Sequence, residues 1–323
     1  MNPTETGNGS GPVMMFGSLD AVAGLLAERI QRAGFEAVGV GLEEPPGWPG
    51  EAVFQIRRDR REVASAVREL RPKCLVNFCA DPIGRSGRLA LANAAMRAAA
   101  SVSVPLLIHW GSAAAYPQQS SNGHPWLETD TFDEATRARD LTTVDRAVRE
   151  FAGVHSRTSV YLLRVAATVG PRGAVAVEEL LRTPVVPRLR PEPMMQFLHE
   201  DDAAEILWRA VQEGHGGTYN VAADGLMRLS EVCRAVSRPS VVLPVRLAWG
   251  LACLTWLLRQ GPSPARQLRW SSGLPILDNT RLKTHLGMRP RYTGREALEA
   301  ARAQTASDSD GRPVVAESTD RED

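Results

Sequence analysis

This sequence has few lysines, few aromatic residues and almost no net charge. Its 38 basic and 37 acidic residues give a formal charge of +1, so the overall composition does not indicate a nucleic-acid or membrane partner. Only two lysines occur, Lys73 and Lys283. Their scarcity limits the chemistry available, because a nearby lysine is a common means of lowering the pKa of a catalytic phenol.

Cysteine is also scarce, and the four that occur form no metal or redox motif. Cys74, Cys79, Cys233 and Cys253 include no C-x-x-C pair, which argues against a zinc knuckle or a thioredoxin-like site. The sequence contains neither metal-ligand spacing nor a Gly-x-Ser-x-Gly nucleophile elbow. We therefore expect no bound metal, and we expect core thiols in a reducing, cytoplasmic compartment.

Long hydrophobic runs are missing as well. The most apolar stretch, Leu247 to Leu258, is shorter than the roughly 20 residues that a membrane span requires. We expect it to be a buried or lid helix, with an amphipathic helix on a membrane surface as the alternative. Residues 1–11 contain no Lys or Arg, so we do not expect them to be a signal peptide.

Short apolar runs alternate with helical periodicity through the first half of the chain. Strands are predicted at residues 13–16, 36–41, 51–56, 74–78, 104–110 and 159–165, and helices between them at 21–33, 58–72, 87–100 and 135–153. Strands that are apolar on both faces and separated by helices indicate a parallel sheet with helices on both sides. The predicted fold class is α/β, a doubly wound, Rossmann-like parallel sheet with a small C-terminal mixed cap.

The pattern changes after Gly170, which suggests a division of the chain. Prolines break up the next segment, then HEDDAAEILWRAVQEG predicts a helix capped by Asp201 or Asp202, and GTYNVA predicts another strand. We predict a flexible N-terminus over 1–11, a Rossmann-like domain over 12–170, and a mixed region over 171–302 that completes the sheet and forms the substrate cap. Residues 303–323 are acidic and aperiodic, and we expect them to be a disordered tail.

Six segments in this order are similar to one known family. They are FGSLDAVAG, IHWGSAAAYP, LLRVAATVGPRG, QFLHEDDAAEILWRAV, GGTYNVAADGLMRLSEV and DNTRLKTHLGMRPRYTGREALE. Together they resemble the extended short-chain dehydrogenases/reductases, the NAD-dependent epimerase/dehydratase family of sugar-nucleotide enzymes, from about Val13 to Ala301. The resemblance implies a bound NAD or NADP and hydride transfer by a Ser or Thr, a Tyr, and a Lys four residues after the Tyr.

The turn that holds the cofactor's diphosphate in that family departs from the family pattern here. Its glycines let the backbone approach the diphosphate, but in this chain Gly17 is followed by Asp20 and Ala23. A carboxylate about 4 Å from a like charge costs on the order of 4 kcal/mol, roughly a thousandfold in affinity. We expect Asp20 to cap the following helix. The resemblance implies a cofactor site at Gly17, Ser18, Asp20, Ala23 and Glu43, with NAD or NADP binding weak or lost.

The family's catalytic residues are only partly present. Ser112 falls on the catalytic serine, whereas alignment of VDRAVREFA with the family's helix puts Arg137 at the Tyr position and Leu141 at the Lys position. No tyrosine in the chain has a lysine four residues later. The resemblance therefore implies that the standard hydride chemistry is absent.

Proton-transfer chemistry is still open to the remaining side chains. The candidate catalytic residues are Ser112, Tyr116, Arg137 and His199, with His124 and Asp140 in the same expected cleft. Each has a structural alternative. His199 would fix the backbone before the helix, Tyr116 would pack beneath the end of the fifth strand, and His124 and Asp140 would be solvated.

Four functions remain compatible with the sequence. The first is a degenerate family member that binds a small metabolite in the family pocket. The others are an NAD(P)-dependent sugar-nucleotide epimerase or reductase with substituted residues, a cofactor-independent isomerase or cyclase, and a non-catalytic ligand sensor or partner-binding protein. Small residues in LALANAAMRAAA and TTVDRAVREFA would allow a homodimer through two long helices. Three tryptophans in the expected cap suggest either an apolar ligand or core packing, namely Trp249, Trp256 and Trp270.

Overall fold

The computed structural model of this chain describes residues 11–41, 48–50, 52–55, 60–78, 85–117, 124–130, 139–173, 180, 185–258, 268 and 273–309. Its centre is a sheet of seven parallel strands in the order β11-β6-β5-β4-β1-β2-β3. These strands are β1 (Val13–Gly17), β2 (Ala37–Gly41), β3 (Ala52–Gln55), β4 (Cys74–Phe78), β5 (Leu106–Ser112), β6 (Ser159–Val165) and β11 (Gly217–Val221). The predicted doubly wound parallel sheet is confirmed.

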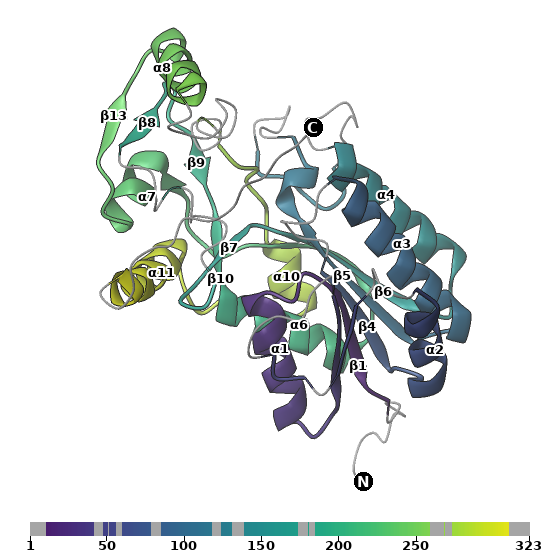
Figure 1. The fold of residues 1–323 in the computed structure, drawn as a ribbon. Helices are drawn as coiled ribbons and strands as arrows, with labels where there is room; N and C mark the ends of the chain where they lie inside the picture. Colours follow the sequence, from purple (N-terminus) through teal and green to yellow (C-terminus); the bar gives the residue numbers. More distant parts are fainter. Residues whose placement is uncertain are drawn as a thin grey trace.

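Helices cover both faces of this sheet (Figure 1). On one face lie α1 (Ala21–Arg32), α6 (Glu200–Glu213) and α10 (Thr280–His285), and on the other α2 (Arg60–Leu70), α3 (Arg85–Val102) and α4 (Arg139–Val154). Strand β1 shows why the central strands are apolar throughout. Val13 and Met15 pack toward α1 and α6, whereas Met14 and Phe16 pack toward α3, so every side chain of the strand is buried.

A smaller region lies beside the sheet (Figure 1) and has its own hydrophobic core. Its elements are β7 (Ala167–Val169), β8 (Val186–Arg188), β9 (Met194–Met195), β10 (Phe197–His199), β12 (Met227–Arg228), α7 (Leu229–Ala235), β13 (Ser240–Val242), α8 (Val245–Leu257) and α11 (Gly294–Ser309). The strands form two-stranded pairs, β10 with β7, β12 with β9 and β13 with β8. Helix α11 continues to Ser309, so its C-terminal end extends past residue 302, where the sequence predicts a disordered tail.

Helix α8 was predicted to be a buried or lid helix, and the structure contradicts the buried alternative. Only its small residues Ala248 and Ala252 are buried, while Trp249 and Trp256 are 44% and 55% exposed. These two tryptophans therefore do not belong to the core, and Trp270 lies outside the described residues. Cys253 on the same helix is exposed, whereas Cys74 and Cys233 are buried as expected. Cys79 also lies outside the described residues.

Candidate functional site

Ser112 and Tyr116 lie where strand β5 ends. Ser112 is the last residue of β5, and its Oγ accepts the N–H of Ala114 at 3.2 Å, which caps the short 3-10 helix η1 (Ala113–Ala115). The chain then reaches Tyr116, whose N–H donates to the carbonyl of Ala113. The serine is thus held at the carboxyl edge of the sheet, where doubly wound folds place their ligands.

Tyr116 is buried in a polar cluster. Its ring stacks on Trp126 with a centroid separation of 5.0 Å, and its Oη accepts from Arg164 Nη1 at 2.5 Å and lies 3.0 Å from Asn220 Oδ1. Burial raises the pKa of this phenol even though Arg164 opposes the shift. A general acid or base works best with a pKa near the working pH, so this environment favours a structural phenol.

Arg164 and Asp145 form the centre of the cluster. Arg164 stands on β6 and donates to Asp145 of α4 twice, from Nε to Oδ2 at 2.8 Å and from Nη2 to Oδ1 at 3.1 Å. Both side chains are almost fully buried, at 3% and 4% exposure. Our sequence analysis missed this pair. The one available signal was a charged residue inside the apolar strand SVYLLRV.

A small cavity adjoins Ser112. Its volume is about 10 Å³, which is room for about one water molecule. Leu141 of α4 lines this cavity together with Ser112, Asp145 and Arg164, so an aliphatic side chain stands beside the serine where the family resemblance requires a lysine. His109, on the same wall, accepts from the Asn77 amide at 3.0 Å, and burial lowers its pKa to about 4. It is therefore neutral near pH 7.

His199 has a structural role at the start of α6. Its Nδ1 accepts the N–H of Asp201 at 3.1 Å, and its ring stacks on Tyr292 at a centroid separation of 4.0 Å. Burial lowers the pKa of this imidazole, so the ring stays neutral and acts as the N-cap. The prediction that Asp201 or Asp202 caps α6 is therefore wrong. Both carboxylates lie within the first turn of the helix.

The other predicted cleft residues are in different surroundings. His124 is exposed, with its Nδ1 2.7 Å from the carbonyl oxygen of Pro125, and Asp140 pairs with Arg88 on α3. Arg137 and Glu43 lie outside the described residues. Among the residues that the structure describes, no group of three or more His, Cys, Asp or Glu could hold a metal ion.

The turn before α1 is occupied by the chain's own carboxylate. Asp20 is the N-cap, as predicted, and its Oδ1 accepts from the N–H groups of Val22 at 3.0 Å and Ala23 at 3.3 Å. These amides belong to the helix end that would face a diphosphate. A methyl group built on Gly173 would lie 2.8 Å from the Cβ of Ala21, so a second segment approaches the same helix end. This arrangement does not fit a dinucleotide diphosphate.

Gly17 is explained by packing alone. Its φ is +118°, and a Cβ at this position would lie 2.1 Å from the carbonyl oxygen of Phe78 on the neighbouring strand β4. Any other residue would therefore be strained and would also clash with backbone. The one family glycine that this turn keeps is required whether or not a nucleotide binds.

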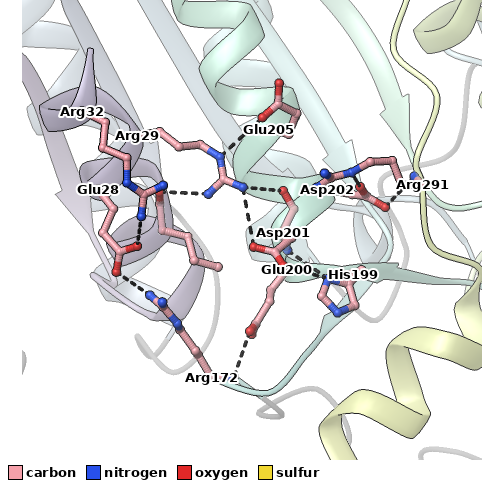
Figure 2. A network of polar contacts seen from close by, with 11 residues as sticks. Glu28, Arg29, Arg32, Arg172, His199, Glu200, Asp201, Asp202, Glu205 and Arg291 are labelled. Atoms are coloured by element: carbon pink, nitrogen blue, oxygen red, sulfur yellow. Dashed lines mark hydrogen bonds and ion pairs between the residues drawn. The ribbon is translucent and has the colours of Figure 1, made fainter. Parts of the chain in front are cut away.

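The segment near Gly173 is tied down by Glu200 (Figure 2). The Glu200 carboxylate accepts the N–H groups of Arg172 and Gly173, each at 2.8 Å. The Arg172 side chain in turn pairs with Glu28 of α1 at 2.5 Å. Arg29, one residue further along α1, pairs with Asp201 and Glu205 of α6. This network joins α1, α6 and the 170–173 turn.

A larger cavity lies away from Ser112, beside α6. Its volume is about 390 Å³, and its walls come from α6 and from residues 287–291. Asp202 of α6 accepts the N–H groups of Arg291 and Tyr292 at 2.9 and 3.0 Å, which fixes this segment against the helix. The predicted site residues Ser112, Tyr116 and His199 are not among the residues that line this cavity.

Sequence comparison finds relatives without an assigned activity. No protein-family model matches the chain. An uncharacterized protein of Mycobacterium tuberculosis is 30% identical over 162 residues, which are 50% of this chain and 43% of that protein. A second one is 25% identical over 281 residues, which are 85% of this chain and 28% of that protein. The chain therefore spans less than half the length of these relatives.

Solved structures share the fold. A UDP-glucose 4-epimerase of Stenotrophomonas maltophila, with bound NAD and formylated UDP-arabinopyranose, matches with a TM-score of 0.73 and 15% identity over 94% of this chain and 100% of that one. A dTDP-glucose 4,6-dehydratase of Bacillus anthracis, in complex with NAD, matches with a TM-score of 0.70 and 11% identity over 93% of this chain and 98% of that one. The chain thus has the fold of the NAD-dependent sugar epimerases and dehydratases.

Proposed function

We propose that this chain is a degenerate member of the epimerase/dehydratase family that binds a small metabolite without hydride transfer. The observation that carries the proposal is Leu141 beside Ser112 in one cavity. An aliphatic side chain cannot lower the pKa of a phenol, and the chain contains no Tyr-x-x-x-Lys pair. Fold alone does not assign a reaction, so the proposal depends on the site.

The turn before α1 supports the same proposal. Asp20 already satisfies the amides of Val22 and Ala23, and its carboxylate would repel a diphosphate. We infer that NAD or NADP binding is weak or lost. The ligand would bind at the carboxyl edge of the sheet, under the cap that we propose for residues 171–302.

Binding of candidate ligands in the absence of NAD tests this function. We expect a nucleotide sugar such as UDP-glucose, or another small metabolite from a screen, to raise the melting temperature without NAD, as any ligand specific for the native state does. No absorbance from reduced nicotinamide should appear when NAD is added with the ligand. Reduction of NAD, or turnover that requires it, would overturn the proposal.

A matched pair of serine variants localises the ligand. Ser112→Ala should weaken binding by about fivefold or more, because a hydrogen bond made to the ligand is lost. Ser101→Ala serves as the control, since Ser101 also makes one local hydrogen bond, to the carbonyl of Ala98 on α3. Equal affinities for the two variants would place the ligand elsewhere.

We also propose a homodimer in the cytoplasm, formed through α3 and α4. These two helices pack on each other, and α3 carries small residues along its length, such as Ala94. Light scattering should give the mass of a dimer, and Ala94→Arg should give that of a monomer, because the bulky charge prevents close helix approach. A monomeric native protein would contradict this prediction.

A further inference from the structure

Helix α8 exposes many large apolar side chains. Six of its large side chains are between 44% and 76% exposed, namely Leu247, Trp249, Leu251, Leu254, Trp256 and Leu257. Val241 and Val242 of the neighbouring strand β13 are exposed too. Large apolar side chains that gather on one exposed helix and the strand before it indicate an interaction site. We call these eight residues the α8 surface.

The packing of α8 against the protein leaves its large side chains exposed to solvent. The helix lies on the protein through Ala248 and Ala252, one turn apart, so the small residues face inward. In Figure 1, α8 and β13 lie at the end of the small region, away from the seven-stranded sheet. The helix therefore protrudes and can meet a flat partner.

The sequence that contains this helix carries charge of one sign. From residue 232 to residue 277 the sequence contains six arginines and no Asp, Glu or Lys, although the whole chain has a formal charge of only +1. Arg246 on α8 and Arg234 on α7 are both exposed. A bilayer of anionic lipids has negatively charged headgroups above apolar acyl chains. Arginine beside exposed leucine and tryptophan is complementary to such a bilayer.

We propose that the α8 surface binds peripherally to an anionic lipid bilayer. The helix has 13 residues, or about 20 Å at 1.5 Å per residue, which is too short to cross a hydrocarbon core of about 30 Å. Among the described residues no helix is long and apolar enough to cross a membrane. The helix lies in the interface, with its leucines and tryptophans among the acyl chains and Arg246 at the headgroups. This inference does not depend on the proposed function.

Vesicle flotation with the full chain tests the proposal. We expect binding to vesicles of phosphatidylcholine with about one third phosphatidylglycerol, and weaker binding to phosphatidylcholine alone or at high salt. The double variant Leu254→Gln with Leu257→Gln should bind at least about tenfold more weakly, because it loses two leucine side chains that insert among the acyl chains. Arg246→Gln should bind about fivefold more weakly, to the anionic vesicles only.

Matched controls distinguish binding by the α8 surface from nonspecific adsorption to the vesicles. Leu226→Gln with Val154→Gln replaces two exposed apolar residues elsewhere, and Arg157→Gln replaces an exposed arginine in the turn after α4. These controls should bind as the native chain does, and melting temperatures should agree among all variants. Absence of vesicle binding overturns the proposal. So does self-association that the double variant abolishes without any vesicle binding, since a second copy would then cover the surface.

Discussion

Calorimetric titration with NAD or NADP is expected to give no saturable heat up to about 1 mM nucleotide, because the charge of Asp20 alone costs roughly a thousandfold in affinity. The titration is run above neutral pH, since burial raises the pKa of this carboxyl and the ionised form must prevail. Denaturation of the purified protein should likewise release no nucleotide.

Two variants of Asp20 separate its charge from its occupation of the helix end. Asp20→Asn removes the charge but keeps a good N-cap, so weak binding should return while the amide oxygen still occupies the N–H groups of Val22 and Ala23. Asp20→Gly also frees both amides, and its binding should be tighter than that of Asp20→Asn. Micromolar binding by the native chain would show that the turn accepts a diphosphate in spite of Asp20.

Replacement of Arg164 by alanine is expected to lower the free energy of unfolding by about 3–5 kcal/mol, because the buried Asp145 carboxylate then loses its buried ionic partner and keeps the half-exposed Arg149. The side chains of both residues are less than 5% exposed. Urea unfolding followed by circular dichroism measures the loss. The double variant Arg164→Met with Asp145→Leu should recover most of it, since an apolar pair leaves no buried charge.

Arg149 provides the control for this measurement. It pairs with the same Asp145 at 2.9 Å, but its side chain is 51% exposed. Arg149→Ala should therefore cost at most about 1 kcal/mol, as solvated ion pairs do. Equal losses for the two arginine variants would mean that Arg164 is more hydrated than its burial indicates, and the cluster would not be the stabilising centre of this edge of the sheet.

Most of the central sheet could be predicted because its signals are local. Strands β1, β4, β5 and β6 are mostly apolar on both faces, and the helices between them show helical periodicity. The cap at Asp20 was predictable for the same reason, since an aspartate directly before an apolar-periodic segment is a common N-cap. His199 was expected, as one alternative, to fix the backbone before α6, but it was not predicted as the N-cap because histidine is not among the residues that usually fill this position.

The surroundings of Tyr116 depend on contacts that no local pattern contains. Its partners Arg164 and Asn220 are 48 and 104 residues away in the sequence, and only the order of strands β5, β6 and β11 brings them together. Sequence spacing placed Tyr116 near Ser112. It could not show that the phenol is buried and its hydrogen bonds already made.

Helix α8 shows a different limit of prediction from the sequence. A helix that is apolar on all sides usually lies inside a protein, and periodicity gives no direction to a helix without a polar face. The small residues Ala248 and Ala252 decide the outcome, because they are the residues of this helix that the protein buries. A short apolar segment is therefore a poor indicator of burial when its partner surface is unknown.

The close approach of Gly17 to Phe78 has an evolutionary consequence. Selection for stability alone would keep a glycine here, since any side chain would meet the Phe78 carbonyl. Loss of the nucleotide would relax the constraint on the second and third glycines of the turn and leave the first unchanged. A lone surviving first glycine in a chain with this fold is then a mark of inherited architecture, and it gives no information about whether the ancestral ligand still binds.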